Sequence, residues 1–132
     1  MTRSARARRG ERASASVEFA LVLPLVLIMA MALLQVGLLV KDQLVVEGSA
    51  RAGAREGAVT VDDAEAEQVA RQAAVSLDLS RLELVVQREG GVGTPVSMKV
   101  VYHAHVVVPL VAWLFPDTID LGATAVMRQE TG

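Results

Sequence analysis

The chain has 132 residues, of which 52% are hydrophobic and only 3% aromatic, and its formal net charge is −2. This length accommodates one small domain, and the absence of cysteine excludes a disulfide framework and thiol chemistry. The mildly acidic balance leaves no basic surface for phosphates, so the composition predicts no nucleic-acid partner.

The first element in chain order is an uncharged run, 19–40, preceded by a basic leader, 1–18. Its twenty-two residues, at about 1.5 Å each, give roughly 33 Å of helix, enough to cross the apolar part of a bilayer. The leader carries five arginines, whereas only Lys41 immediately follows the run, and positive charge tends to stay inside. We therefore expect a single-pass cytoplasmic-membrane protein with a cytoplasmic N-terminus and an extracytoplasmic C-terminal domain.

A cleaved secretory signal peptide has the same order of basic and apolar segments. Three features argue against that alternative: the run exceeds the usual signal core of about 7–15 residues, Glu18 stands at its entrance, and a helical pattern continues after it.

The helical pattern extends through 41–58, which contains no proline. Glu47 precedes Arg51 by four residues, the favourable order for a helical ion pair. Small residues also recur every four positions in two rows, which are Ala50, Ala54 and Ala58, and Ser49, Gly53 and Gly57.

Such rows let another backbone approach closely, so Ala50, Ala54, Gly53 and Gly57 are predicted to form a packing face for neighbouring helices. The alternative is that alanine is simply a good helix former. In that case each glycine would weaken the helix by about 1 kcal/mol without a compensating packing contact.

Residues 60–130 predict a small αβ head outside the membrane. A second helix is expected to begin at Thr60, which fits a capping-box variant with Asp63, and to run to about Ser76. Its acidic first turn lacks the spacing of a calcium loop and suits the positive end of the helix dipole. The apolar stripe of this helix comprises Ala66, Val69, Ala70, Ala73 and Leu77.

From Arg81 onward the apolar period changes from 3.6 to 2, which indicates strands with one buried face. Three strands are expected, the second running from Val96 to Val108 and the third from Ile119 to Met127, with a glycine-rich hairpin loop after the first. The predicted class is α+β: a long N-terminal transmembrane helix continuing outward, a second amphipathic helix, and a three-stranded antiparallel sheet covered by helix. The first strand is expected to bury Leu82, Leu84 and Val86, and the third Ile119, Leu121, Ala123, Ala125 and Met127.

The connection between the last two strands, 109–116, is strongly apolar and includes Trp113 and Phe115. Exposure of such an apolar connection to water is unfavourable, so it is expected to pack against another surface. Capping of the small core, contact with the membrane interface and contact with a partner subunit all remain open.

No motif of catalytic chemistry occurs, so we expect neither an enzyme nor a cofactor. His103 and His105 are two apart in a strand and point to one face, where Asp120 or Glu83 would have to complete a metal site. Two imidazoles fall short of the usual ligand set, so a solvated strand face is the preferred interpretation and no metal is predicted.

Glu18 is the residue that most needs an explanation, because an ionised carboxylate at the start of an apolar span is costly at depth. It either lies at headgroup level and reaches water, or pairs with a cation from another chain.

The segment Arg12 to Leu25, RASASVEFALVLPL, resembles the N-terminal signature of TadE-like proteins, pseudopilins of the tight-adherence (Tad, or Flp-type) pilus machinery. The segment Ala50 to Ala58 and the close of the last strand, Ala125 to Arg128, are also similar to that family. The resemblance implies a non-enzymatic minor pilin or pseudopilin. Its implied partners are a prepilin peptidase, other pilin-like subunits and the Tad secretion and assembly proteins.

The resemblance further implies cleavage between Ala13 and Ser14, which makes Glu18 the fifth mature residue, followed by Phe19 at the head of the apolar helix. Ala13 stands where the family usually has glycine; cleavage after Gly10 would make Glu18 the eighth residue. In such assemblies the new amino group of one subunit neutralises the glutamate of its neighbour. Two other classes stay open: an uncleaved, signal-anchored binding module acting through the His103 face, and an anchored metalloenzyme.

Overall fold

The computed structural model describes the backbone of residues 3–131 and the side chains of residues 14–131, so the side chains of residues 1–13, including Ala13, lie outside the described residues. Helix α1 (Arg3–Val59) contains 57 residues and is followed by α2 (Asp63–Ala73). A three-stranded antiparallel sheet completes the fold, so the predicted α+β class is confirmed. Its strands are β1 (Leu82–Arg88), β2 (Pro95–His105) and β3 (Thr118–Arg128), and two short 3-10 helices are η1 (Leu79–Arg81) and η2 (Pro109–Leu114).

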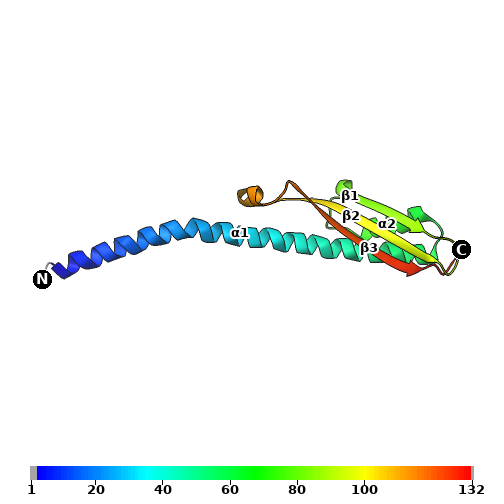
Figure 1. The fold of residues 1–132 in the computed structure, drawn as a ribbon, viewed down its shortest axis with the longest axis horizontal. Helices are drawn as coiled ribbons and strands as arrows, with labels where there is room; N and C mark the ends of the chain where they lie inside the picture. Colours follow the sequence, from blue (N-terminus) through cyan, green and yellow to red (C-terminus); the bar gives the residue numbers. More distant parts are fainter. Residues whose placement is uncertain (1–2, 132) are drawn as a thin grey trace.

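Helix α1 has two different environments along its length of about 86 Å. Figure 1 shows its N-terminal half extending away from the rest of the molecule, while its C-terminal half lies under the sheet. Pro24 lies inside the helix, where proline removes a backbone hydrogen bond and favours a bend. The N-terminal half of α1 is visibly bent in Figure 1.

The sheet has the order β1-β2-β3, and both pairings are antiparallel. Helices α1 and α2 cover one face: α1 contacts β2 and β3, and α2 contacts α1 and β1. The predicted period of two is confirmed in β2, where every second residue is buried. The hairpin between β1 and β2 is also present, and only Gly93 in it has a positive φ, of 88°. The buried side chains of β2 are Val96, Met98, Val100, Tyr102 and Ala104.

The small-residue rows of α1 lie at the centre of the head. A Cβ atom built on Gly53 would stand 2.6 Å from Met98 Cε and 2.9 Å from Ala70 Cβ, closer than real Cβ contacts. One turn earlier, the Ser49 hydroxyl donates to the Ala70 carbonyl at 2.7 Å. The backbones of α1 and α2 therefore approach so closely that only a glycine fits between them at this crossing.

The second helix begins and ends inside its predicted limits. Asp62, not Thr60, is its N-cap, and the Asp62 carboxylate accepts a hydrogen bond from the Ala64 N–H at 2.9 Å. Thr60 acts before the helix instead, where its hydroxyl accepts from the Asp62 N–H. After Ala73 the chain turns, which exposes Ala73 and buries Ala74 in its place. The expected start at Thr60 and the place of Ala73 in the apolar stripe were therefore wrong.

The second strand ends three residues before its predicted limit of Val108. The apolar alternation continues past His105, but the N–H groups of Val107 and Val108 donate to Gln35 Oε1 of α1, at 3.0 and 3.1 Å. The chain therefore leaves the sheet and turns to α1, a contact that no local pattern predicts.

Arg88 joins three segments at the end of the head that is distant from the N-terminus. Its Nη1 donates to the Gly57 carbonyl at 2.8 Å, and its Nη2 donates to the Thr60 carbonyl at 3.0 Å. Its Nε lies 2.6 Å from an Asp63 carboxylate oxygen. A side chain of β1 thereby bonds to one carbonyl in the last turn of α1 and to one just after the helix, where carbonyls lack partners within the helix.

We expect Gly53→Ala to lower the free energy of unfolding by about 1 kcal/mol, because overpacking costs about 1–3 kcal/mol and the gain in helix propensity offsets about 1. The Met98 methyl group can swing aside, but Ala70 Cβ is fixed to the α2 backbone. Urea unfolding of the full chain in detergent micelles, followed by circular dichroism, measures the change.

Gly48→Ala is the matched control, because a Cβ atom at Gly48 meets nothing within 4 Å. This substitution should raise the unfolding free energy by up to about 1 kcal/mol through helix propensity alone. Equal stabilisation by the two substitutions would contradict the close approach at Gly53.

Candidate functional site

Between Val17 and Val40, α1 presents a largely exposed apolar surface. The stretch Ser14–Val59 has the length and composition of a membrane-spanning helix, and its most apolar window is 0% buried. The Phe19 side chain is 66% exposed. Such a surface needs lipid or other apolar helices around it, so the helix has the character of a single-pass membrane anchor. Other large apolar side chains exposed here are Val17, Leu21, Val22, Leu25, Val26 and Leu27.

Glu18 lies at the start of this surface, one turn after Ser14. The Ser14 hydroxyl donates to Glu18 Oε1 at 3.3 Å, and both side chains are exposed. The structure therefore brings three of the predicted processing and assembly residues, Ser14, Glu18 and Phe19, to one short exposed stretch of helix. The fourth, Ala13, has its side chain outside the described residues.

The residues predicted to pack against neighbouring helices do not lie on the exposed surface around Glu18. Gly53, Gly57 and Ala54 are buried inside the head, where they meet α2 and the sheet of the same chain. Ala50 is also buried, at 1% exposed, and faces β3. The chain itself thus fills this face of α1.

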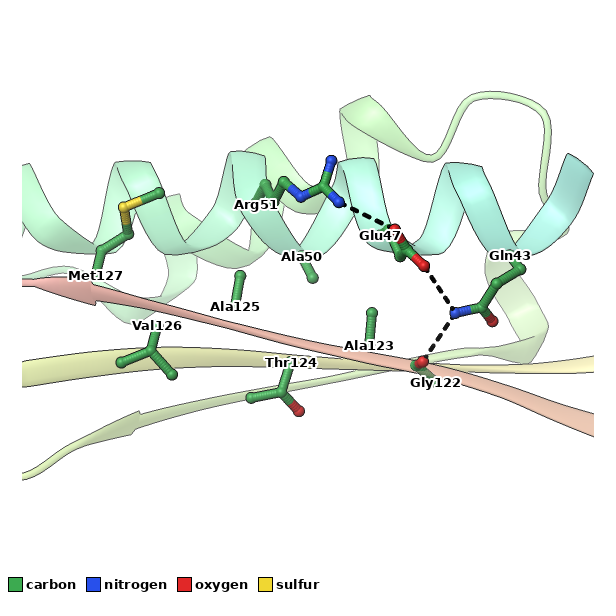
Figure 2. A pocket seen from close by; sticks show the side chains of 10 residues that line it. All are labelled: Gln43, Glu47, Ala50, Arg51, Gly122, Ala123, Thr124, Ala125, Val126 and Met127. Carbon is green, nitrogen blue, oxygen red and sulfur yellow. Dashed lines mark hydrogen bonds and ion pairs between the residues drawn. The ribbon is translucent and has the colours of Figure 1, made fainter. Parts of the chain in front are cut away.

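An open groove of about 520 Å³ runs between α1 and β3. Figure 2 shows Ala50 on the helix opposite Ala123 and Ala125 on the strand, and these short side chains leave the space between the two elements unfilled. Across the groove Gln43 Nε2 donates to the Gly122 carbonyl at 3.1 Å and to Glu47 Oε1 at 3.4 Å.

The rim of this groove is polar. Glu47 and Arg51 form the helical ion pair predicted from their spacing, with an N–O distance of 3.0 Å (Figure 2). Both side chains are substantially exposed, so the pair contributes under about 1 kcal/mol. The groove follows β3, which is an edge strand of the sheet, so backbone groups border it along with the side chains.

On the other face of the sheet, His103 lies between two carboxylates. Its Nδ1 is 2.6 Å from Asp120 Oδ1, directly opposite on β3, and its Nε2 is 3.1 Å from Glu83 Oε1 on β1. The hydrogen bond to Asp120, followed by that to Glu83, raises the pKa of His103 above its usual value of 6.5. The arrangement favours an imidazolium ion that donates to both carboxylates, and this form has no lone pair for a metal.

The two histidines do not act together. His105 Nδ1 contacts the Arg81 guanidinium, whereas His103 contacts carboxylates. Within residues 14–131, no group of three or more histidine, cysteine, aspartate or glutamate side chains is arranged to hold a metal ion. His103 therefore belongs to a cross-strand ion-pair network in this structure.

The apolar connection after β2 folds as η2 and lies beside α1. Trp113 is 73% exposed, and its indole N–H donates to the Leu110 carbonyl at 3.1 Å, while Phe115 is half-buried. Gln35 fixes this connection by accepting hydrogen bonds from the N–H groups of Val107 and Val108. The sequence analysis did not identify Gln35 as a contact residue. The available signal was that Gln35 is the one polar side chain in the run 19–40.

Comparison with known proteins supports the resemblance seen in the sequence. The family model described as TadE-like protein matches residues 13–55, which include Glu18, Phe19 and the small-residue rows as far as Ala54. The match confirms the similarity to this family over that segment, which is about a third of the chain. No curated protein and no solved structure gives a significant match to the chain.

The raised pKa of His103 generates a prediction for pH dependence. A group whose folded pKa is raised contributes stability that is fully present below its unfolded pKa, here near 6.5, and is lost as the pH rises through the folded value. The sheet should therefore become less stable as the pH rises through that window. Asp120→Asn should lower the His103 pKa more than Glu83→Gln does, because the hydrogen bond from Asp120 is the largest cause of the shift.

Nuclear magnetic resonance titration of the His103 imidazole in the full chain checks this ordering. A titration midpoint at or below 6.5 in the unsubstituted protein would show that the carboxylates do not hold the imidazolium.

Proposed function

We propose that this protein is a minor pilin or pseudopilin of a Tad pilus, a structural subunit that a prepilin peptidase processes between Ala13 and Ser14. The observation that carries the proposal is the bare apolar half of α1 with Glu18 at its head, inside the segment that matches the TadE-like family. The helix crosses the cytoplasmic membrane with its N-terminus inside, and the head lies outside the cytoplasm. Its partners are the peptidase, other pilin-like subunits and Tad assembly proteins.

Glu18 supplies the assembly contact in this proposal. Cleavage before Ser14 creates an amino group four residues from Glu18 in the sequence, close to a carboxylate whose side chain is exposed. A carboxylate and an ammonium ion are each costly inside lipid, and pairing offsets much of that cost. Each subunit therefore offers one charge of each sign to its neighbours, and correct register is the arrangement that pairs them.

Lateral contacts between subunits come from the exposed side chains around Phe19. They do not come from the glycine and alanine rows, because the chain's own α2 and sheet occupy those rows. Helices of neighbouring subunits accordingly pack against the N-terminal half of α1. The head is packed on the C-terminal half of the same helix, so its position is set by the position of α1.

Processing predicts a specific mass. Protein extracted from membranes of cells that contain the cognate prepilin peptidase should lack Met1 to Ala13 and begin at Ser14, as measured by intact mass spectrometry. Ala13→Gly should increase the processed fraction, because it restores the residue usual at this position in TadE-like proteins. A full-length mass in both proteins would favour an uncleaved, signal-anchored binding module.

Assembly predicts a dependence on the charge of Glu18. Glu18→Gln should leave membrane insertion intact but reduce copurification with other pilin-like subunits, because the neighbouring ammonium ion then lacks its partner in lipid. Glu89→Gln, an exposed carboxylate of the β1–β2 hairpin, is the matched control and should copurify normally. Normal copurification of the Glu18→Gln protein would refute the charge-pairing role.

A further inference from the structure

A second uncharged segment of the chain lies beside the membrane helix. Residues 106–116, between His105 and Asp117, contain no charged side chain. Their central part is η2, which contacts α1. Figure 1 shows η2, in orange, beyond the end of the sheet and displaced along α1 toward its N-terminus. This segment therefore reaches back over the apolar half of the helix, away from the core of the head.

Gln35 holds the segment in that place. The Gln35 side chain is 1% exposed, and its Oε1 accepts from the N–H groups of both Val107 and Val108. Nonhelical backbone at membrane depth requires its polar groups to be satisfied by protein, and this amide satisfies two of them. The side-chain oxygen of the one polar residue in the run 19–40 thus bonds within the chain.

The level of this contact on α1 lies inside the apolar run. Gln35 precedes Val40, the last uncharged residue, by five positions, or about 7.5 Å of helix. The next residues of the same stripe toward the N-terminus, Ala32, Met31 and Ile28, are partly covered, whereas most of their neighbours are exposed. Because η2 is the element beside this part of the helix, it overlaps the part of the span nearest the head.

The side chains of η2 divide into two sets. Val111 is 0% exposed and is therefore packed inside the protein, and η2 as a whole contacts α1. Leu110, Trp113 and Leu114 are 62%, 73% and 46% exposed, on the side that faces away from the protein. The indole N–H of Trp113 is already bonded to the Leu110 carbonyl, so the exposed side presents apolar atoms without an unmet donor at that ring. In water such a surface would be unfavourable.

We propose that η2 is embedded among the acyl chains of the outer leaflet, as a second membrane-inserted segment anchored to the span by Gln35. Lipid is the occupant because the surface continues that of the span, at the same level and with the same lack of charge. The segment sets the depth and rotation of the head relative to the bilayer. This inference rests on the proposed membrane location of the run 19–40.

The single tryptophan makes the proposal directly measurable. The full chain is reconstituted at low protein density into phosphatidylcholine vesicles, either ordinary or brominated in the acyl chains. Trp113 should show blue-shifted emission, loss of emission in brominated vesicles, and protection from aqueous iodide. Iodide quenching without quenching by brominated lipid would overturn the proposal.

The control moves the tryptophan to the opposite end of the head. In a protein with Trp113→Phe and Val92→Trp, the probe lies in the exposed β1–β2 hairpin and should be quenched by iodide and not by brominated lipid. Equal lipid quenching at both sites would also overturn the proposal, because the signal would then not depend on η2.

Two glutamine variants test the anchor. Gln35→Leu leaves the Val107 and Val108 N–H groups without their acceptor, so the segment should move toward water, with less lipid quenching and more iodide quenching of Trp113. Gln43→Leu removes a glutamine of α1 that bonds to Gly122 instead, and should leave Trp113 unchanged. Identical Trp113 quenching in the Gln35→Leu and unsubstituted proteins would refute the anchoring role.

Three further outcomes separate the causes of failure. Flotation of the vesicles tests the span itself: a chain that does not float with them overturns both the proposed membrane location and this inference. A chain that floats but exposes Trp113 to iodide overturns this inference alone. Protection that appears only at high protein density would identify a second copy as the occupant and would likewise overturn it.

Discussion

The structure depends on how closely other elements approach α1 at Gly53. At that position α2 and β2 both reach the helix surface, and a single added carbon would collide with Ala70 and Met98. The Ser49 hydroxyl bonds to the Ala70 carbonyl on the same side of the helix, so the contact also has a fixed register. A helix with larger residues in these rows would push α2 and the sheet outward and open the small core.

This approach makes α1 part of the head and not a tether to it. The same helix continues without a break into the apolar half, so the head cannot reorient without bending or unwinding a helix. In the proposed assembly, the contacts that neighbouring subunits make around Glu18 consequently set where each head is placed. The groove beside β3 and the His103 face have fixed orientations relative to the span for the same reason.

Polar side chains form hydrogen bonds between segments that are distant in sequence. Gln35 joins α1 to the segment after β2, and Arg88 joins β1 to the end of α1 and the start of α2. In a chain without cysteine, these contacts define which segments meet, while apolar packing supplies most of the cohesion. Gln35 Oε1 and the Arg88 guanidinium are hydrogen-bonded in place, which offsets the cost of removing these groups from water.

The sequence by itself determined whatever depends on residues close together in the chain. Apolar length predicted the long exposed helix, the change of period at Arg81 predicted the sheet, and the motif around Glu18 predicted the similarity to the TadE-like family, because each signal is local. Only the tertiary structure decided where β2 ends, since this depends on Gln35, seventy residues away. The sequence named Asp120 and Glu83 as possible neighbours of His103, and strand register decided that both bond to it. The small residues predicted a close approach of another element to α1. Tertiary packing decided that α2 and β2 of the same chain are the elements that approach.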